Sequence, residues 1–166
     1  MFKEEIKLTI NYRIQDYIDA NRIDFRSRFI FQILRFIALC YVLFLALFIA
    51  VSPNPNFYEI LVLILFLAFV FFEWTWLPFL SKSLFEQQRK FFKNQVSLIF
   101  RQDEIVEICA YQELKLRWLY KHITTPKILL IFINPKSFII VPKKYCSSEE
   151  QYEEICHLIA KFPQGY

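Results

Sequence analysis

Apolar and polar positions divide the chain into three regions with different periods. Residues 4–12 alternate strictly, and the positions on their apolar side are Ile6, Leu8, Ile10 and Tyr12. A period of two residues predicts a half-buried β-strand. No neighbouring segment offers this strand a partner, so we assign residues 1–12 to a sheet formed by the far end of the chain.

A helical period follows and leads into two long apolar runs. Residues 13–28 predict an amphipathic helix, and residues 29–51 and 57–80 are each long enough to cross a hydrocarbon core of about 30 Å. The turn at 52–56 holds two prolines and two asparagines, which favour turns over helix. The pattern predicts a transmembrane hairpin, and Pro78 is a candidate kink where its second helix joins the segment at 81–94.

The charges of the hairpin predict its orientation. The 52–56 turn carries no Lys or Arg, so we place this turn outside the cytoplasm and both termini inside it. Near the two ends of the second span lie the predicted membrane-interface anchors Trp74, Trp76 and Tyr58.

Three arginines precede the first span, at Arg22, Arg26 and Arg28. Recognition of an anionic lipid usually needs a cluster of 4–8 basic residues. Three arginines fall short of that number, so we interpret them as orientation charges and not as a headgroup site.

Arg35 and Glu73 fall at nearly the same depth when the hairpin is folded about Asn54. They predict either an ion pair between the two helices or two separate side chains that reach the membrane interface. Ionisable residues within a membrane are functional candidates. These two lie roughly 25–28 Å from the turn by helical rise, near the interface, which favours a structural role over transport.

The C-terminal region returns to a period of two. Residues 81–94 predict a juxtamembrane helix, and a helix capped by Ser147 and Glu150 ends the chain. Between them the alternation predicts strands at 95–101, 105–110, 113–120, 127–133 and 138–141. The predicted fold class is therefore a membrane α+β protein. A two-helix hairpin is inserted into a small antiparallel sheet or barrel formed by residues 1–12 and 95–166, which the C-terminal helix caps.

Several segments carry a family resemblance. They are the leading strand, residues 16–22, the close pair of spans, residues 118–123, and residues 138–145 before the helix start at 147–150. Together they resemble the YcxB-like family of small bacterial membrane proteins. The resemblance implies a pleckstrin-homology-like (PH-like) fold for the C-terminal region and a place in the bacterial inner membrane. It implies no biochemical activity.

Composition supports a membrane protein and excludes several function classes. Hydrophobic residues make up 56% of the chain and concentrate in the hairpin. A net charge of +4 is too small to indicate nucleic-acid binding. The four cysteines show no C-x-x-C spacing, which disfavours a zinc site or disulfide framework and favours a reducing compartment.

The sequence shows no pattern that indicates catalysis. Its two histidines, His122 and His157, have no partner at metal-ligand spacing, and Cys156 lies next to His157 in a helix, so their side chains point apart. The one glycine is near the C-terminus, so no glycine loop can cradle a phosphate. We predict no enzyme activity, no metal and no cofactor.

A basic surface is the remaining candidate site, formed by Arg117, Lys121, His122, Lys127, Lys143 and Lys144. It predicts either a solvated rim beside an anionic membrane or a site for a lipid headgroup or protein partner. Scattered surface Lys and Arg are ordinary, which favours the rim.

We therefore predict a membrane-anchored interaction or regulatory module that faces the cytoplasm and acts without catalysis. Its expected partners are the lipid bilayer and either a protein or further copies of itself, and not nucleic acid. The alternative is an oligomeric small membrane protein that acts in transport or as an immunity (toxin-neutralising) protein, in which Arg35 and Glu73 act directly.

Overall fold

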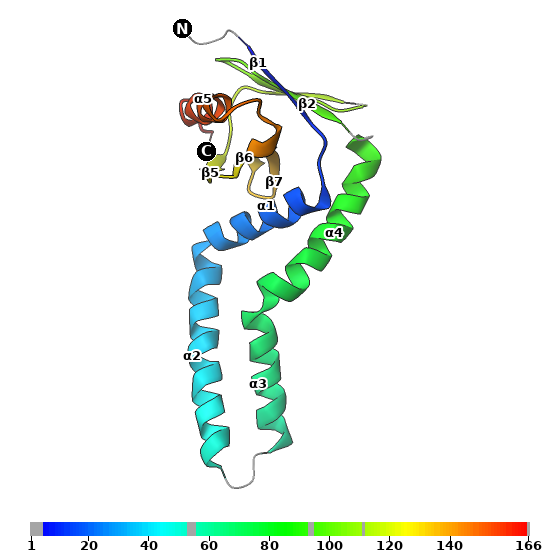
Figure 1. Cartoon of the computed structure of the whole chain (residues 1–166). Coiled ribbons are helices and arrows are strands. Elements are labelled where there is room, and N and C mark those ends of the chain that lie inside the picture. The colour runs from blue at the N-terminus through cyan, green and yellow to red at the C-terminus, as the bar shows by residue number, and fades with distance from the viewer. Residues whose placement is uncertain (1–4, 53–55, 93–94, 111, 166) are drawn as a thin grey trace. The chain divides into compact units, whose positions relative to one another are not determined.

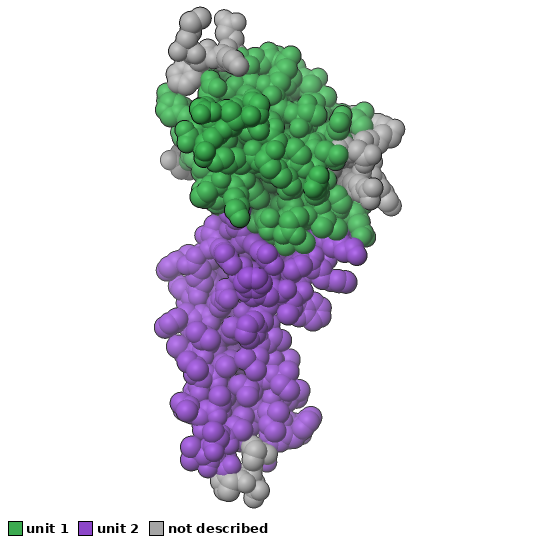
Figure 2. Space-filling view, in the orientation of Figure 1, with its two compact units in different colours: residues 1–20, 84–166 green, residues 21–83 purple. Residues whose placement is uncertain are grey.

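The computed structural model describes residues 5–52, 56–92, 95–110 and 112–165, without the side chains of 88–92. It contains two compact units (Figure 2). Unit 1 comprises residues 1–20 and 84–166, and unit 2 comprises residues 21–83. The middle of the turn predicted at 52–56 lies outside the described residues.

Unit 1 begins with a four-stranded antiparallel sheet in sequence order. Its strands are β1 (Ile6–Ile10), β2 (Val96–Phe100), β3 (Ile105–Ile108) and β4 (Glu113–Leu116). β1 pairs with β2, with Leu8 opposite Leu98 (Figure 1). The strand predicted within residues 1–12 therefore lies in a sheet with residues that follow the whole of unit 2 in the sequence.

The rest of unit 1 differs from the predicted single sheet or barrel. A second antiparallel sheet contains β5 (Lys121–Thr124), β6 (Ile128–Asn134) and β7 (Ser137–Pro142). The strand predicted at 113–120 was wrong in its second half, because the chain leaves the first sheet after Leu116. There the Leu119 N–H donates to the Pro163 carbonyl at 3.0 Å and the Leu119 carbonyl accepts from the Gly165 N–H at 2.9 Å.

One hydrophobic core joins both sheets and α5 (Glu149–Ala160). It includes Ile10 of β1, Ile131 of β6 and Ile155 of α5, all fully buried. The N-cap of α5 is Ser148, one residue later than predicted, because Ser148 has the extended backbone and accepts from the Gln151 N–H at 3.2 Å. The two ends of the chain thus share one core.

Unit 2 is built on two packed helices. α2 (Phe29–Val51) has the predicted bounds and packs on α3 (Phe57–Val70) through Ala38, Val42 and Val70. Unit 2 also contains the end of α1 (Ile14–Ser27) and the start of α4 (Phe72–Phe92).

The second predicted span is broken. α3 and α4 meet at Phe71 with a bend of 61°, whereas α4 continues through Pro78, where the kink was predicted. The Phe71 carbonyl accepts from the Trp74 N–H at 2.9 Å and from the Thr75 hydroxyl at 3.1 Å. These hydrogen bonds lie where α3 ends and α4 begins, and Pro78 takes no part in them.

By length and composition, α2 can cross a membrane. Within the described residues, the α3–α4 pair satisfies the same criterion only if the bent pair counts as one span.

Candidate functional site

A pocket of about 360 Å³ lies in unit 1 between the start of α1 and one end of the second sheet. The register pairs Ile128 with Pro142, so Lys127 and Lys143 lie side by side just beyond the paired residues. The Lys143 N–H donates to the Lys127 carbonyl at 2.8 Å, which extends this pairing by one step. The lining residues are Gln15, Asp16, Asp19, 126–128 and 142–144.

The pocket carries charges of both signs. The Asp16 carboxylate is 5% exposed, accepts from the Arg13 N–H at 2.9 Å and lies 2.5 Å from the Lys144 ammonium. Lys143 forms an ion pair with Glu149. Two of the three lysines are therefore neutralised by carboxylates, and among the described residues no carboxylate pairs with Lys127.

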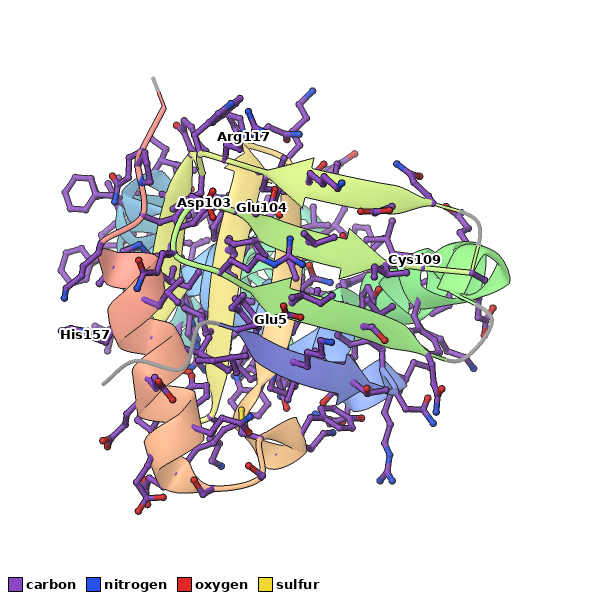
Figure 3. All side chains as sticks on the ribbon, turned by 90° about the horizontal axis from the view of Figure 1, so that it is seen from above. Glu5, Asp103, Glu104, Cys109, Arg117 and His157 are labelled. Atoms are coloured by element: carbon purple, nitrogen blue, oxygen red, sulfur yellow. The ribbon has the colours of Figure 1, made fainter. Side chains whose placement is uncertain are left out.

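The structure does not bring all six predicted basic residues together. Lys121 is opposite Phe132 near the other end of β6, where its ammonium lies 4.4 Å from the ring centroid of Phe132. His122 follows it in β5, and its Nδ1 is buried without a hydrogen bond within the described structure. Arg117 is exposed just beyond the end of β4 (Figure 3). Of the six predicted residues, the structure thus brings together Lys127, Lys143 and Lys144.

Three of the four thiols, all in unit 1, have raised pKa values. Burial raises the pKa of the Cys109 thiol to about 11, and burial also raises the pKa of Cys146 and of Cys156. Such thiols are protonated at neutral pH. His157 is exposed on α5 and points away from the sheets (Figure 3). The described residues contain no group of three or more side chains placed to hold a metal ion.

Glu107 is a half-buried carboxyl that the sequence reasoning did not single out. It pairs with Leu98 and with Leu114 in the register of β3, so it shares their face of the first sheet, on which Leu98 is fully buried. Burial raises the pKa of Glu107 to about 7. The alternation of the sequence could have indicated this position, because it places Glu107 on the same side of the strand as Ile105.

Unit 2 contains a second candidate site around Glu73, whose side chain is 1% exposed. The Arg35 Nη1 donates to Glu73 Oε2 at 3.0 Å, so the two residues predicted to share a depth are in contact. Arg26 forms an ion pair with the other oxygen, Oε1. The sequence reasoning missed this third member because it treated Arg26 only as an orientation charge.

The three predicted interface anchors are all exposed on unit 2, at Tyr58, Trp74 and Trp76. The Arg22 guanidinium lies 5.0 Å from the centroid of the Trp74 ring, within the range of a cation–π contact. One arginine that precedes α2 therefore meets one predicted interface anchor of α4.

Comparison with known proteins gives one match. Residues 104–159 match the family model described as YcxB-like protein. This confirms the predicted family over the segment that runs from β3 into α5 and contains the pocket lysines Lys127, Lys143 and Lys144. No curated protein and no solved structure matches the chain.

Proposed function

We propose that this YcxB-like chain is a membrane-anchored interaction or regulatory module that acts without catalysis. Unit 1 would face the cytoplasm and bind a protein partner. The observation that carries the proposal is the pocket of unit 1, which gathers Lys127, Lys143 and Lys144 beside the start of α1. Its volume of about 360 Å³ falls in the range of ligand-binding pockets, roughly 300–1,000 Å³.

The anchor in this proposal is the hairpin of unit 2. α2 would form one span and the bent α3–α4 pair the other, in the bacterial inner membrane with both termini in the cytoplasm. The lack of Lys or Arg in 52–56 supports this orientation, and the exposed Tyr58, Trp74 and Trp76 suit the two interfaces. Two antiparallel sheets with a C-terminal helix support the PH-like fold that the family resemblance implies.

The pocket suits an acidic side chain on the partner. Lys143 and Lys144 already face Glu149 and Asp16, which leaves Lys127 to attract a carboxylate. Around Lys127 lie Pro126, Ile128 and Pro142, which provide apolar contact. An acidic residue beside a small apolar one is therefore the expected recognition element.

Purification of the full chain in mild detergent, followed by mass spectrometry, tests the proposal. A stoichiometric partner should be recovered with the native chain and lost with Lys127→Glu. Lys136→Glu is the matched control, because Lys136 is an exposed lysine of the same unit outside the pocket and the charge change is identical. Repeated recovery of the chain alone would count against a partner.

The membrane placement has its own test. Alkaline extraction should leave the native chain in the membrane pellet. Release into the supernatant would contradict the anchor, whatever the partner assay shows.

A second candidate function is an oligomeric membrane protein in transport or immunity. The observation that supports this alternative is the buried Glu73 between two arginines. Replacing Arg35 and Glu73 together by Leu separates the candidates. A cellular phenotype that survives the double change but needs unit 1 supports the interaction module. Loss of the phenotype with normal insertion supports the alternative.

A further inference from the structure

Unit 2 gathers more arginines than the three that precede α2 in the sequence. The folded hairpin brings Arg35 to the Glu73 carboxylate that Arg26 also contacts. Arg28 pairs with Asp24 at 2.8 Å. With Arg22 beside Trp74, the cluster holds four arginines and two carboxylates. It reaches the lower limit of the 4–8 basic residues expected for anionic-lipid recognition.

The arginines around Glu73 keep donors available. The carboxylate is 1% exposed, whereas the side chains of Arg26 and Arg35 are 58% and 40% exposed. Glu73 neutralises one of these two charges, and each guanidinium has five N–H donors. Exposed guanidinium edges with surplus positive charge bind phosphate well, because their planar fork donates two parallel hydrogen bonds.

An apolar groove of about 390 Å³ lies on the same helices. It is lined by Leu34, Ile37, Ala38, Leu65, Phe66 and Phe69. On α2 it begins at the residue before Arg35, and on α3 it ends four residues before Glu73. The groove therefore runs from the level of the arginine cluster toward the middle of the hairpin.

We propose that unit 2 binds an anionic phospholipid. Arg26 and Arg35 would hold its phosphate, and the groove would hold part of one acyl chain. Basic pockets at the cytoplasmic end of membrane helices bind anionic headgroups in this way. The proposal rests on the membrane placement given above, since only an embedded hairpin would meet a lipid at this depth.

A second copy of the chain fits the groove less well than a lipid does. Two copies related by a two-fold axis would present the same patch to each other. Both arginine clusters would then lie at the same level and repel each other, whereas a phosphate would neutralise the surplus charge.

Native mass spectrometry of the full chain tests the proposal, with phosphatidylglycerol and phosphatidylcholine as the probes. The native chain should retain phosphatidylglycerol preferentially. Arg26→Gln leaves the Arg35–Glu73 contact in place and should weaken phosphatidylglycerol binding about fivefold, the equivalent of one basic residue near the surface. Lys82→Gln removes one exposed positive charge elsewhere in unit 2 and should leave the preference unchanged.

The groove has a matched pair of variants on α2. Ile37→Trp fills the groove and should reduce retention of phosphatidylglycerol. Leu47→Trp adds the same ring at an exposed position outside the groove and should not.

Four results would overturn the proposal. They are equal retention of the two lipids, native affinity in Arg26→Gln, a change of oligomeric state in Ile37→Trp with lipid retention intact, and full competition by inorganic phosphate. A chain that alkaline extraction releases from membranes would instead refute the proposed anchor. Loss of lipid preference in a chain that stays embedded refutes this inference alone.

Discussion

Replacing Ile10 by Ala tests whether the two ends of the chain stabilise one folded body. The Ile10 side chain is 0% exposed, lies opposite Val96 and shares a core with Ile131 and Ile155. Removing a buried Ile side chain costs about 2–5 kcal/mol, including the cavity left behind. A domain of the size of unit 1 has about 5–15 kcal/mol of stability in total, so Ile10→Ala would remove a large share.

The expected loss of stability can be measured in β6, far from Ile10 in the sequence. A loss of about 3 kcal/mol should lower the melting temperature of unit 1 by about 12–24 °C. Hydrogen exchange of β6 in the full chain in detergent should become faster by about two orders of magnitude, because a cooperative unit loses stability throughout. β6 begins more than a hundred residues after Ile10, so only a shared core can transmit the effect.

Thr9→Ala is the control in the same strand. Its side chain is exposed, so the substitution should cost less than about 1 kcal/mol and leave β6 protected. If Ile10→Ala abolishes the protection of β1 but leaves that of β6 unchanged, β1 is a peripheral strand and the reasoning is refuted.

Three further predictions follow from single contacts. The pKa of Glu107 is raised from 4.5 to about 7, so the folded state binds this proton more tightly than the unfolded state does. The stability of unit 1 should therefore fall by about 3 kcal/mol from pH 4.5 to pH 7 and then level off. In thermal unfolding, Glu107→Gln should lose this pH dependence, and an unchanged pH dependence would contradict the assignment. Tyr12→Phe removes an O–H that donates to the Ile140 carbonyl at 2.6 Å. The free energy of unfolding, measured by denaturant titration, should therefore drop by about 1–2 kcal/mol. An unchanged denaturation midpoint would show that this hydrogen bond does not stabilise the fold. The losses of unfolding free energy caused by Arg35→Leu and Glu73→Leu should be non-additive. In detergent unfolding, the double variant should be at least about 1 kcal/mol more stable than the sum of the two single losses predicts. Additive losses would argue against a coupled pair.

The elements with a strong local signal in the sequence were predictable. Residues 29–51 are almost wholly apolar, and α2 has these bounds. The alternation of residues 4–12 indicated a strand with a distant partner, and β1 pairs with β2. β1 is indicated by an alternation of period two and α2 by a long apolar run, and both signals are visible in the sequence.

The breaks between elements were not predictable from local pattern. Residues 113–118 alternate and the predicted strand was extended to residue 120, yet Leu119 binds the backbone of Pro163 and Gly165 instead of a neighbouring strand. The bend of the second hairpin helix occurs at Phe71, an apolar residue with no sequence signal, and not at Pro78. Both breaks depend on bonds made elsewhere in the fold or along the helix, which a period does not report.

The candidate sites were predictable in part. Equal depth in the hairpin brought Arg35 and Glu73 into one hypothesis, but Arg26 joins them from a different helix. Lys127 and Lys143 meet because Ile128 is opposite Pro142, and that register was not known from the sequence. The charges in the sequence indicated which residue types belong to each site. Which of those residues contact one another is determined by strand register and helix packing.

The insertion of unit 2 between β1 and β2 has a consequence for synthesis on the ribosome. β1 leaves the ribosome before β2, and residues 11–95 must follow before this partner strand is available. At about 5–20 residues per second this delay is roughly 4–17 s. During that time the three apolar side chains of β1 have no sheet to cover them, while the hairpin is being made. Association of β1 with a chaperone or the membrane surface during this interval would protect an edge strand that otherwise promotes aggregation.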